Sequence, residues 1–364
     1  MELKYTLAFL LLLPMLCFGQ YQFTHEKEMA CTSVKSQDNT GTCWSFSTLS
    51  FLESELMRQG KAAVDLSEMY IVRAVYLDKA QNYLLRQGKA SFGQGSLSHD
   101  VIRTASEVGM MPESVFSGKR GKNKHNHSAL VKELKTFLDQ AIKDQATRKT
   151  WRASVENILD KHLGTPPTFF AFEEGSYNAQ AFQKRLGIQL EDYVTLSSYT
   201  HHPFYEQFIL EIPDNYANGS YYNLPIDELH KSVEAALEKG YTVAWNGDVS
   251  ETGFNARQGI AVLPADESSS NIFLQPGKEL SVNQALRQQT FEDYSTQDDH
   301  LMHFTGIAKD QYGTTYYITK NSWGKISPYK GFLYMSTAYF RLKTVAVMLH
   351  KDAIPEAIAA KLGL

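Results

Sequence analysis

The residues that could do chemistry in this chain are a cysteine, two histidines and two carboxamides. Cys43 follows Gly41 and Thr42 and opens a stretch with helical spacing of apolar residues over 43–59. A thiol at a helix N-terminus is favoured in its thiolate form by the helix dipole, and the thiolate is the nucleophilic form. Cys43 is therefore a candidate nucleophile for attack on a carbonyl carbon, with a buried inert thiol as the alternative.

A nucleophile of this kind needs donors aimed at the oxyanion that forms on the attacked carbonyl. Gln37 lies six residues before Cys43, on the segment that enters the expected helix. Its side-chain amide and the backbone N–H of Cys43 would together make a two-donor oxyanion hole. A disulfide between Cys31 and Cys43 is the competing interpretation of the cysteine pair, and the surroundings of Cys43 argue against it.

The general base must come from a histidine. His300 and His303 stand three apart at the start of an expected strand over 301–308. Side chains alternate along a strand, so these two histidines face opposite sides and only one of them can point into a cleft. The spacing alone leaves open which one.

Other polar clusters suggest binding sites less strongly. Asp298 and Asp299 could join His300 around a metal ion, and the pair His201 and His202 could serve another. No spacing there supplies a complete ligand set, and adjacent residues on a strand diverge, so no metal site and no cofactor are expected. Residues 119–127 are basic, contain two histidines and are expected to form a solvated loop.

Three short blocks of sequence resemble the functional segments of papain-like cysteine peptidases. The first runs over residues 34–47 and contains Gln-x5-Cys-Trp-Ser-Phe-Ser; the second, residues 299–306, carries the two histidines; the third, residues 320–324, reads Lys-Asn-Ser-Trp-Gly. They occur in the family's order. The resemblance implies that Cys43 is the nucleophile, that Gln37 completes the oxyanion hole and that peptide bonds are hydrolysed through a thioester acyl-enzyme.

The resemblance also separates the two histidines. The family places a glycine six residues after the catalytic histidine, which fits His300 with Gly306, whereas the same step from His303 reaches Lys309. His300 is thereby the expected base and His303 a structural histidine on the other face. By the same resemblance, Asn321 accepts the second ring N–H of His300, and Trp323 shields that hydrogen bond from water.

Within the superfamily the chain is similar to the bleomycin hydrolase and aminopeptidase C branch. Thr40 stands where papain itself usually has a disulfide cysteine, and the segments 163–167, 225–227, 245–249 and 331–333 all look like that branch. In this branch a C-terminal arm blocks the far subsites of the cleft and makes the enzyme an aminopeptidase. The sequence leaves open whether residues 362–364 reach Cys43. A cysteine endopeptidase with an open cleft is therefore one alternative. A non-catalytic binding protein with the papain-like fold is a second alternative.

The composition and net charge restrict the classes of binding partner that this chain is expected to have. The 364 residues carry 36 Lys plus Arg against 40 Asp plus Glu, a net charge of −4, which argues against a nucleic-acid partner held by counterion release. Peptides are the expected substrates. Residues 1–19 resemble a secretory signal peptide, which predicts a secreted or periplasmic protein without stable membrane insertion after cleavage. Lipid anchoring at Cys17 is disfavoured because Leu16 before it is large.

The order of expected elements predicts a papain-like α+β fold of two lobes with an inserted helical subdomain. Residues 20–112 are predicted to form a mainly helical lobe that carries Cys43, residues 113–240 the largely helical insertion, and residues 241–364 a β-rich lobe that carries His300 and Asn321. The resemblance implies that the insertion allows assembly into a homo-hexamer.

Overall fold

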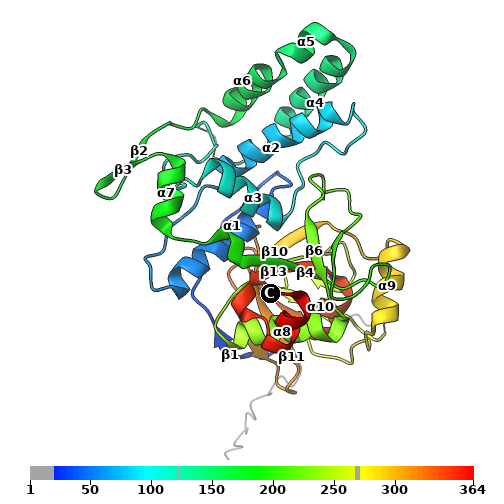
Figure 1. The fold of residues 1–364 in the computed structure, drawn as a ribbon. Coiled ribbons are helices and arrows are strands. Elements are labelled where there is room, and N and C mark those ends of the chain that lie inside the picture. The colour runs from blue at the N-terminus through cyan, green and yellow to red at the C-terminus, as the bar shows by residue number, and fades with distance from the viewer. Residues whose placement is uncertain (1–19, 122, 267–270) are drawn as a thin grey trace, which may run out of the picture.

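The computed structural model describes residues 20–121, 123–266 and 271–364, so the predicted signal peptide and Cys17 lie outside the described residues. Helices from the first half of the chain gather at one end of the molecule, and a large mixed sheet with further helices packed on it lies at the other (Figure 1). The chain therefore has the predicted α+β architecture. In the described part of the chain, no helix is both long and apolar enough to cross a membrane.

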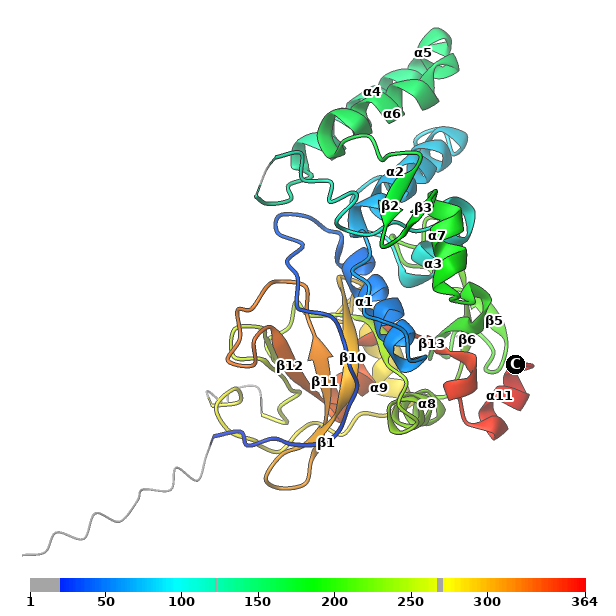
Figure 2. The ribbon, with the colours of Figure 1, turned by 90° about the vertical axis from the view of Figure 1, so that its left-hand side faces the viewer.

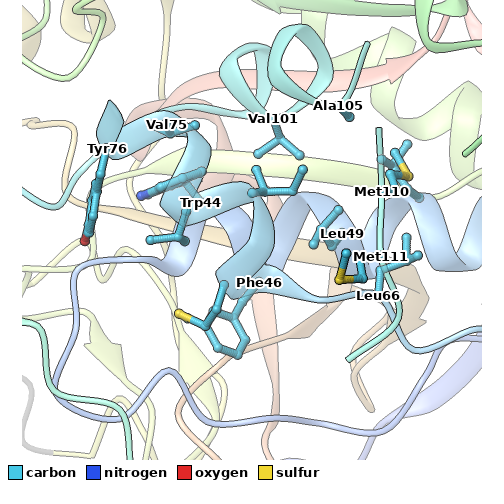
Figure 3. Packing of buried hydrophobic residues seen from close by; sticks show 14 of the residues in the cluster. Trp44, Phe46, Leu49, Leu66, Val75, Tyr76, Val101, Ala105, Met110 and Met111 are labelled. Carbon is cyan, nitrogen blue, oxygen red and sulfur yellow. The ribbon is translucent and has the colours of Figure 1, made fainter. Parts of the chain in front are cut away.

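The helical lobe is built on α1 (Cys43–Arg58), α2 (Glu68–Leu85) and α3 (Ser98–Val108). Apolar residues of all three helices share one core, in which Trp44, Leu49, Val75 and Val101 are fully buried (Figure 3). Helix α1 is buried along almost its whole length, from Cys43 to Leu56. A helix enclosed on every side in this way is fixed in position by its neighbours, and so is the residue at its first position.

The sheet has the strand order β5-β6-β4-β13-β7-β10-β11-β12-β9-β8, and β1 pairs with the far end of β10. Its pairs are antiparallel except for β4 with β6 and β12 with β9. The central strand β10 bulges between Phe304 and Gly306, where Gly306 lies so close to β1 that an added Cβ would stand 2.3 Å from the Lys27 carbonyl oxygen. The strands are β1 (Thr24–Glu28), β4 (Tyr193–Ser197), β5 (Gln207–Ile209), β6 (Ser220–Asn223), β7 (Val243–Gly247), β8 (Phe254–Asn255), β9 (Ile260–Ala261), β10 (His300–Lys309), β11 (Thr315–Lys320), β12 (Phe332–Ser336) and β13 (Thr344–His350).

The predicted insertion contains both helices and strands. Helices α4 (Ser128–Lys143), α5 (Gln145–Lys149) and α6 (Trp151–Leu163) form a hairpin that projects from the helical lobe in both views (Figures 1 and 2). A small ribbon of β2 (Phe170–Phe172) and β3 (Gly175–Tyr177) and helix α7 (Ala179–Leu186) follow. Strands β4, β5 and β6 instead extend the main sheet beyond β13, because β4 pairs with β13 over five residues. This part of the insertion is continuous with the β-rich lobe.

Helices close the outer face of the sheet. Helix α8 (Ile226–Glu238), which begins after Pro225 as expected, packs its apolar side on a second core, as does α10 (Thr337–Lys343). Helix α9 (Gln284–Glu292) leads into the segment before β10. After β13, the turn η2 (Lys351–Ala353) and helix α11 (Glu356–Leu362) return to α8, where Lys361 Nζ lies 2.6 Å from Glu228 Oε1. The last described residues are thereby held against α8.

Candidate active site

Helix α1 lies along strand β10, and this contact brings the candidate nucleophile to the candidate base. Ser47 Oγ donates a hydrogen bond to the Met302 carbonyl oxygen at 2.6 Å. The Ser47 hydroxyl thus satisfies a buried backbone carbonyl of β10, which makes this polar residue of α1 compatible with burial. The first residue of α1 is then level with the first residues of β10.

Cys43 occupies the N-terminus of α1 with 6% of its surface exposed, and it is a free thiol. Its sulfur accepts hydrogen bonds from the backbone amides of Leu301 and Trp44, which lower the pKa of the thiol, but burial has the larger effect and raises this pKa to about 12. Leu301 is the neighbour of His300, so the sulfur lies at the start of β10. Cys31, the other described cysteine, is half-buried and also free, so the competing disulfide does not form.

His300 stands at the first position of β10 and is paired with Asn321. Its Nε2 lies 2.8 Å from Asn321 Oδ1, which fits a ring N–H donated to the amide oxygen. The Trp323 ring covers this pair, with 4.6 Å between the centroids of the two rings. Burial lowers the pKa of His300 to about 4, while the hydrogen bond to Asn321 acts in the opposite direction.

His303 faces the other side of β10. Its Nδ1 lies 2.9 Å from Ser50 Oγ in the middle of α1, and the ring is fully buried. Lys320 Nζ donates to the same hydroxyl at 2.7 Å, so the hydroxyl hydrogen remains for His303. The two histidines therefore point to opposite faces, as strand geometry requires.

Gln37 is fixed between the two lobes. Its side-chain oxygen accepts a hydrogen bond from Ser322 Oγ, and its Nε2 donates to the Thr40 carbonyl oxygen, both at 2.6 Å. The backbone N–H of Gln37 donates to the Ser322 carbonyl oxygen at 2.8 Å. The Gln37 Nε2 amide carries two hydrogens and uses one of them in the bond to Thr40, so its second N–H remains free to donate to an oxyanion.

Gln94 also touches the nucleophile turn, and the sequence analysis missed it. Its side-chain oxygen accepts from the Gly41 N–H at 2.8 Å, and its backbone oxygen accepts from the Trp44 indole at 2.9 Å. These two bonds connect the loop before α3 to both neighbours of the Thr42–Cys43 pair. A glutamine in a glycine-rich loop gives no sequence signal for such a contact, because the contact depends on the packing of two helices.

Two expectations about histidines are corrected. His201 and His202 do converge: their Nε2 atoms lie 3.2 and 2.9 Å from the Glu211 carboxylate. Gln288 Nε2 donates a hydrogen bond to His201 Nδ1. In a neutral His201 ring the hydrogen is then on Nε2, which donates to Glu211. His201, His202 and Glu211 therefore form a hydrogen-bonded group of three side chains. In the loop expected to be solvated, His125 and His127 are buried, with 5% and 2% exposed, because Phe46 and Tyr76 pack against their rings.

This combination of a helix-borne cysteine, a strand-borne histidine and an asparagine defines a papain-like cysteine peptidase. The family model of the Peptidase C1-like family matches residues 109–363, and the chain belongs to that family. The match includes the histidine and asparagine blocks. The segment with Cys43 lies outside this match but inside the span shared with full-length relatives.

Those relatives are peptidases by name. The chain is 26% identical over 382 residues to aminopeptidase G of Lactobacillus delbrueckii subsp. lactis, covering 92% of this chain and 84% of that protein. It is 23% identical over 405 residues to human bleomycin hydrolase, covering 94% and 86%. The crystal structure of PepW from Lactobacillus rhamnosis is similar with a TM-score of 0.75 at 20% identity, covering 93% of this chain and 84% of that one. The papain-like fold and the bleomycin hydrolase and aminopeptidase C branch are thereby confirmed.

Proposed function

We propose that this cysteine peptidase is an aminopeptidase in which Cys43 attacks the carbonyl carbon of the first peptide bond. His300 takes the thiol proton, returns it to the leaving amine, and then activates the water that hydrolyses the thioester. Asn321 orients the ring, and Gln37 with the backbone N–H of Cys43 stabilises the oxyanion. No metal or organic cofactor takes part in these steps.

The observation that carries the proposal is the 2.8 Å contact between His300 Nε2 and Asn321 Oδ1, made beside the strand position whose amide bonds the Cys43 sulfur. It leaves Nδ1 of His300 as the ring atom that can accept a proton. The exopeptidase mode is supported by the names of the relatives, aminopeptidase G and bleomycin hydrolase.

The two described cysteines provide a matched test of the nucleophile. An epoxysuccinyl peptide, which alkylates nucleophilic thiols, should add one equivalent to Cys43, none to Cys31, and abolish hydrolysis. Peptide mapping by mass spectrometry identifies the labelled residue. Hydrolysis that continues after complete labelling of Cys43 would exclude this mechanism and leave the non-catalytic alternative.

We propose further that the protein is exported, that cleavage after residue 19 produces the mature N-terminus, and that mature chains assemble as a homo-hexamer. The projecting hairpin of α4 and α6 supports an assembly role, because it extends from the helical lobe away from the main sheet (Figure 2). N-terminal sequencing of the secreted protein should begin near Gln20. Light scattering should give about six times the mass of one chain, and the mass of a single chain would reject the hexamer.

A further inference from the structure

A segment of the β-rich lobe reaches across to the helical lobe close to the nucleophile. This segment, residues 210–219, joins β5 to β6 and is called the strap below. Tyr216 ties the strap to the helical lobe: its hydroxyl donates to Asp78 Oδ2 of α2 at 2.7 Å and accepts from Arg103 of α3 at 2.8 Å. Leu210 and Ile212 anchor the other end in a core beneath the sheet. The strap is therefore held by both lobes.

The strap carries Asp214 to the wall of the candidate active site. An added Cβ on Gly95 would stand 1.8 Å from Asp214 Oδ2, so the carboxylate lies directly against the Gly95 backbone. Gly95 follows Gln94, the residue whose two hydrogen bonds hold Gly41 and Trp44 on either side of the Thr42–Cys43 pair. The Asp214 carboxylate therefore lies beside the loop that contacts the turn before Cys43.

A second carboxylate comes from the segment that leads into β10. Asp298 lies two residues before His300, and its Oδ2 is buried without a hydrogen-bond partner among the described residues. The charges of both Asp298 and Asp214 act on the Cys43 thiol, and that of Asp214 acts on Asp298. Pro213, the neighbour of Asp214, and Asp298 line the same cavity, so the two aspartates come from different segments of the chain to one region beside the candidate active site.

The space next to Asp298 suits a cation. A cavity of about 520 Å³ is lined by Asp298, by Ile212 and Pro213 of the strap, and by Glu211 and Glu292. No lysine or arginine in the described ranges lines it. Lys79, the lysine whose charge acts on Asp214, donates a hydrogen bond to the Gly95 carbonyl oxygen and does not line this cavity. Burial raises the pKa of Asp298 and holds its carboxyl group largely protonated in the free protein, whereas a bound ammonium group would favour the ionised carboxylate and give its Oδ2 a partner.

We propose that Asp214 and Asp298 bind the protonated α-amino group of the substrate's first residue, and that the strap closes the cleft beyond it. This deepens the proposed aminopeptidase function and rests on it. With the amine fixed there, the first peptide carbonyl is the one placed at Cys43, and one residue is removed in each turnover. Both aspartates are positioning residues, because they act on where the substrate lies.

The test compares two fluorogenic substrates, leucyl-aminomethylcoumarin with a free amine and its N-acetylated form. Asp298→Asn and Asp214→Asn should each raise KM for the free-amine substrate about 10-fold to 100-fold with a smaller change in kcat. The ratio of kcat/KM for free to acetylated substrate should fall by a similar factor. Glu206→Gln, which removes one exposed acid near the strap, should leave this ratio unchanged.

Two further comparisons keep the inference separate from the proposed function. Wild-type protein should cleave a des-amino analogue, with hydrogen in place of the amine, at least 10-fold less efficiently than the free-amine substrate. If wild type cleaves neither substrate, the proposed function fails. If wild type prefers free amines but both aspartate variants keep the wild-type ratio, the function stands and this inference is wrong.

Discussion

At the scale of single residues, burial opposes the ionic form of the candidate catalytic pair, Cys43 and His300. The pKa of Cys43 is raised to about 12 and that of His300 is lowered to about 4, both mainly by burial. The sequence analysis expected the helix dipole to favour the thiolate, but the desolvation of a nearly enclosed thiol is the larger effect. Burial therefore favours the neutral thiol and the neutral imidazole over the ion pair, and in the proposed mechanism the proton moves from sulfur to ring as the carbonyl is attacked.

Substitution of the two histidines of β10 should have different effects, one on kcat and the other on stability. His300→Ala removes the proposed base and should lower kcat by at least about 1000-fold with little loss of stability. His303→Ala leaves a cavity and an unpaired Ser50, so it should lower the free energy of unfolding by about 2 kcal/mol and leave kcat within a few-fold. Urea denaturation and steady-state kinetics measure both. An inactive His303→Ala protein that folds normally would show that the register along β10 is assigned incorrectly.

Asp298→Asn should also change stability, with a definite pH dependence. Burial and the charge of Asp214 raise the pKa of Asp298 to about 8, whereas an unfolded aspartate titrates near 4. The folded state therefore loses stability as pH rises from about 4 to 8, and asparagine removes this loss. We predict a melting temperature about 2 °C above wild type at pH 8 and no difference at pH 4. A lower melting temperature at pH 8 would mean that the carboxylate is paired.

At the scale of elements, the parts that could be predicted are those with strong local patterns. Helix α1 was expected over residues 43–59, β11 over 315–320 and α8 after Pro225, and the structure has Cys43–Arg58, Thr315–Lys320 and Ile226–Glu238. Residues 168–225 were expected to be short strands and loops. Helix α7 was missed there because its polar residues obscure the helical spacing, and the strap was missed because its place depends on contacts with α2 and α3.

The strap should respond to loss of its tie to the helical lobe. Tyr216→Phe removes the hydroxyl that bonds Asp78 and Arg103 while keeping the buried ring. Hydrogen bonds with charged partners contribute about 1.5 to 3 kcal/mol each, so the strap should detach more often. We expect more internal cleavage of N-acetylated peptides and weaker preference for free amines. Tyr222→Phe, on the half-buried β6 residue next to the strap, is the matched control. Equal behaviour of the two variants would contradict this role of the strap.

At the scale of the whole molecule, the candidate active site lies where the core of the helical lobe packs against the core beneath the sheet. Cys43 belongs to the core of the helical lobe, whereas Met302 and Phe304 of the strand that begins at His300 belong to the core beneath the sheet. The sequence blocks predicted which residues would meet, since each block has a characteristic local pattern. They could not predict the cavity lined by Pro213 and Asp298, because these residues are separated by α8, β7 and α9 in the sequence and come together only after the sheet has formed.

The measurement that tests the central claim most directly is the identification of peptide products. A defined mixture of free-amine and N-acetylated peptides is incubated with wild type, Cys43→Ala and Cys31→Ser, and the products are sequenced by mass spectrometry. Wild type and Cys31→Ser should shorten free-amine peptides one residue at a time from the N-terminus, and Cys43→Ala, which should fold normally because it removes only one sulfur atom, should produce nothing. Products released by purified Cys43→Ala would contradict the assignment of Cys43 as the nucleophile, and internal cleavage of acetylated peptides by wild type would contradict the aminopeptidase mode.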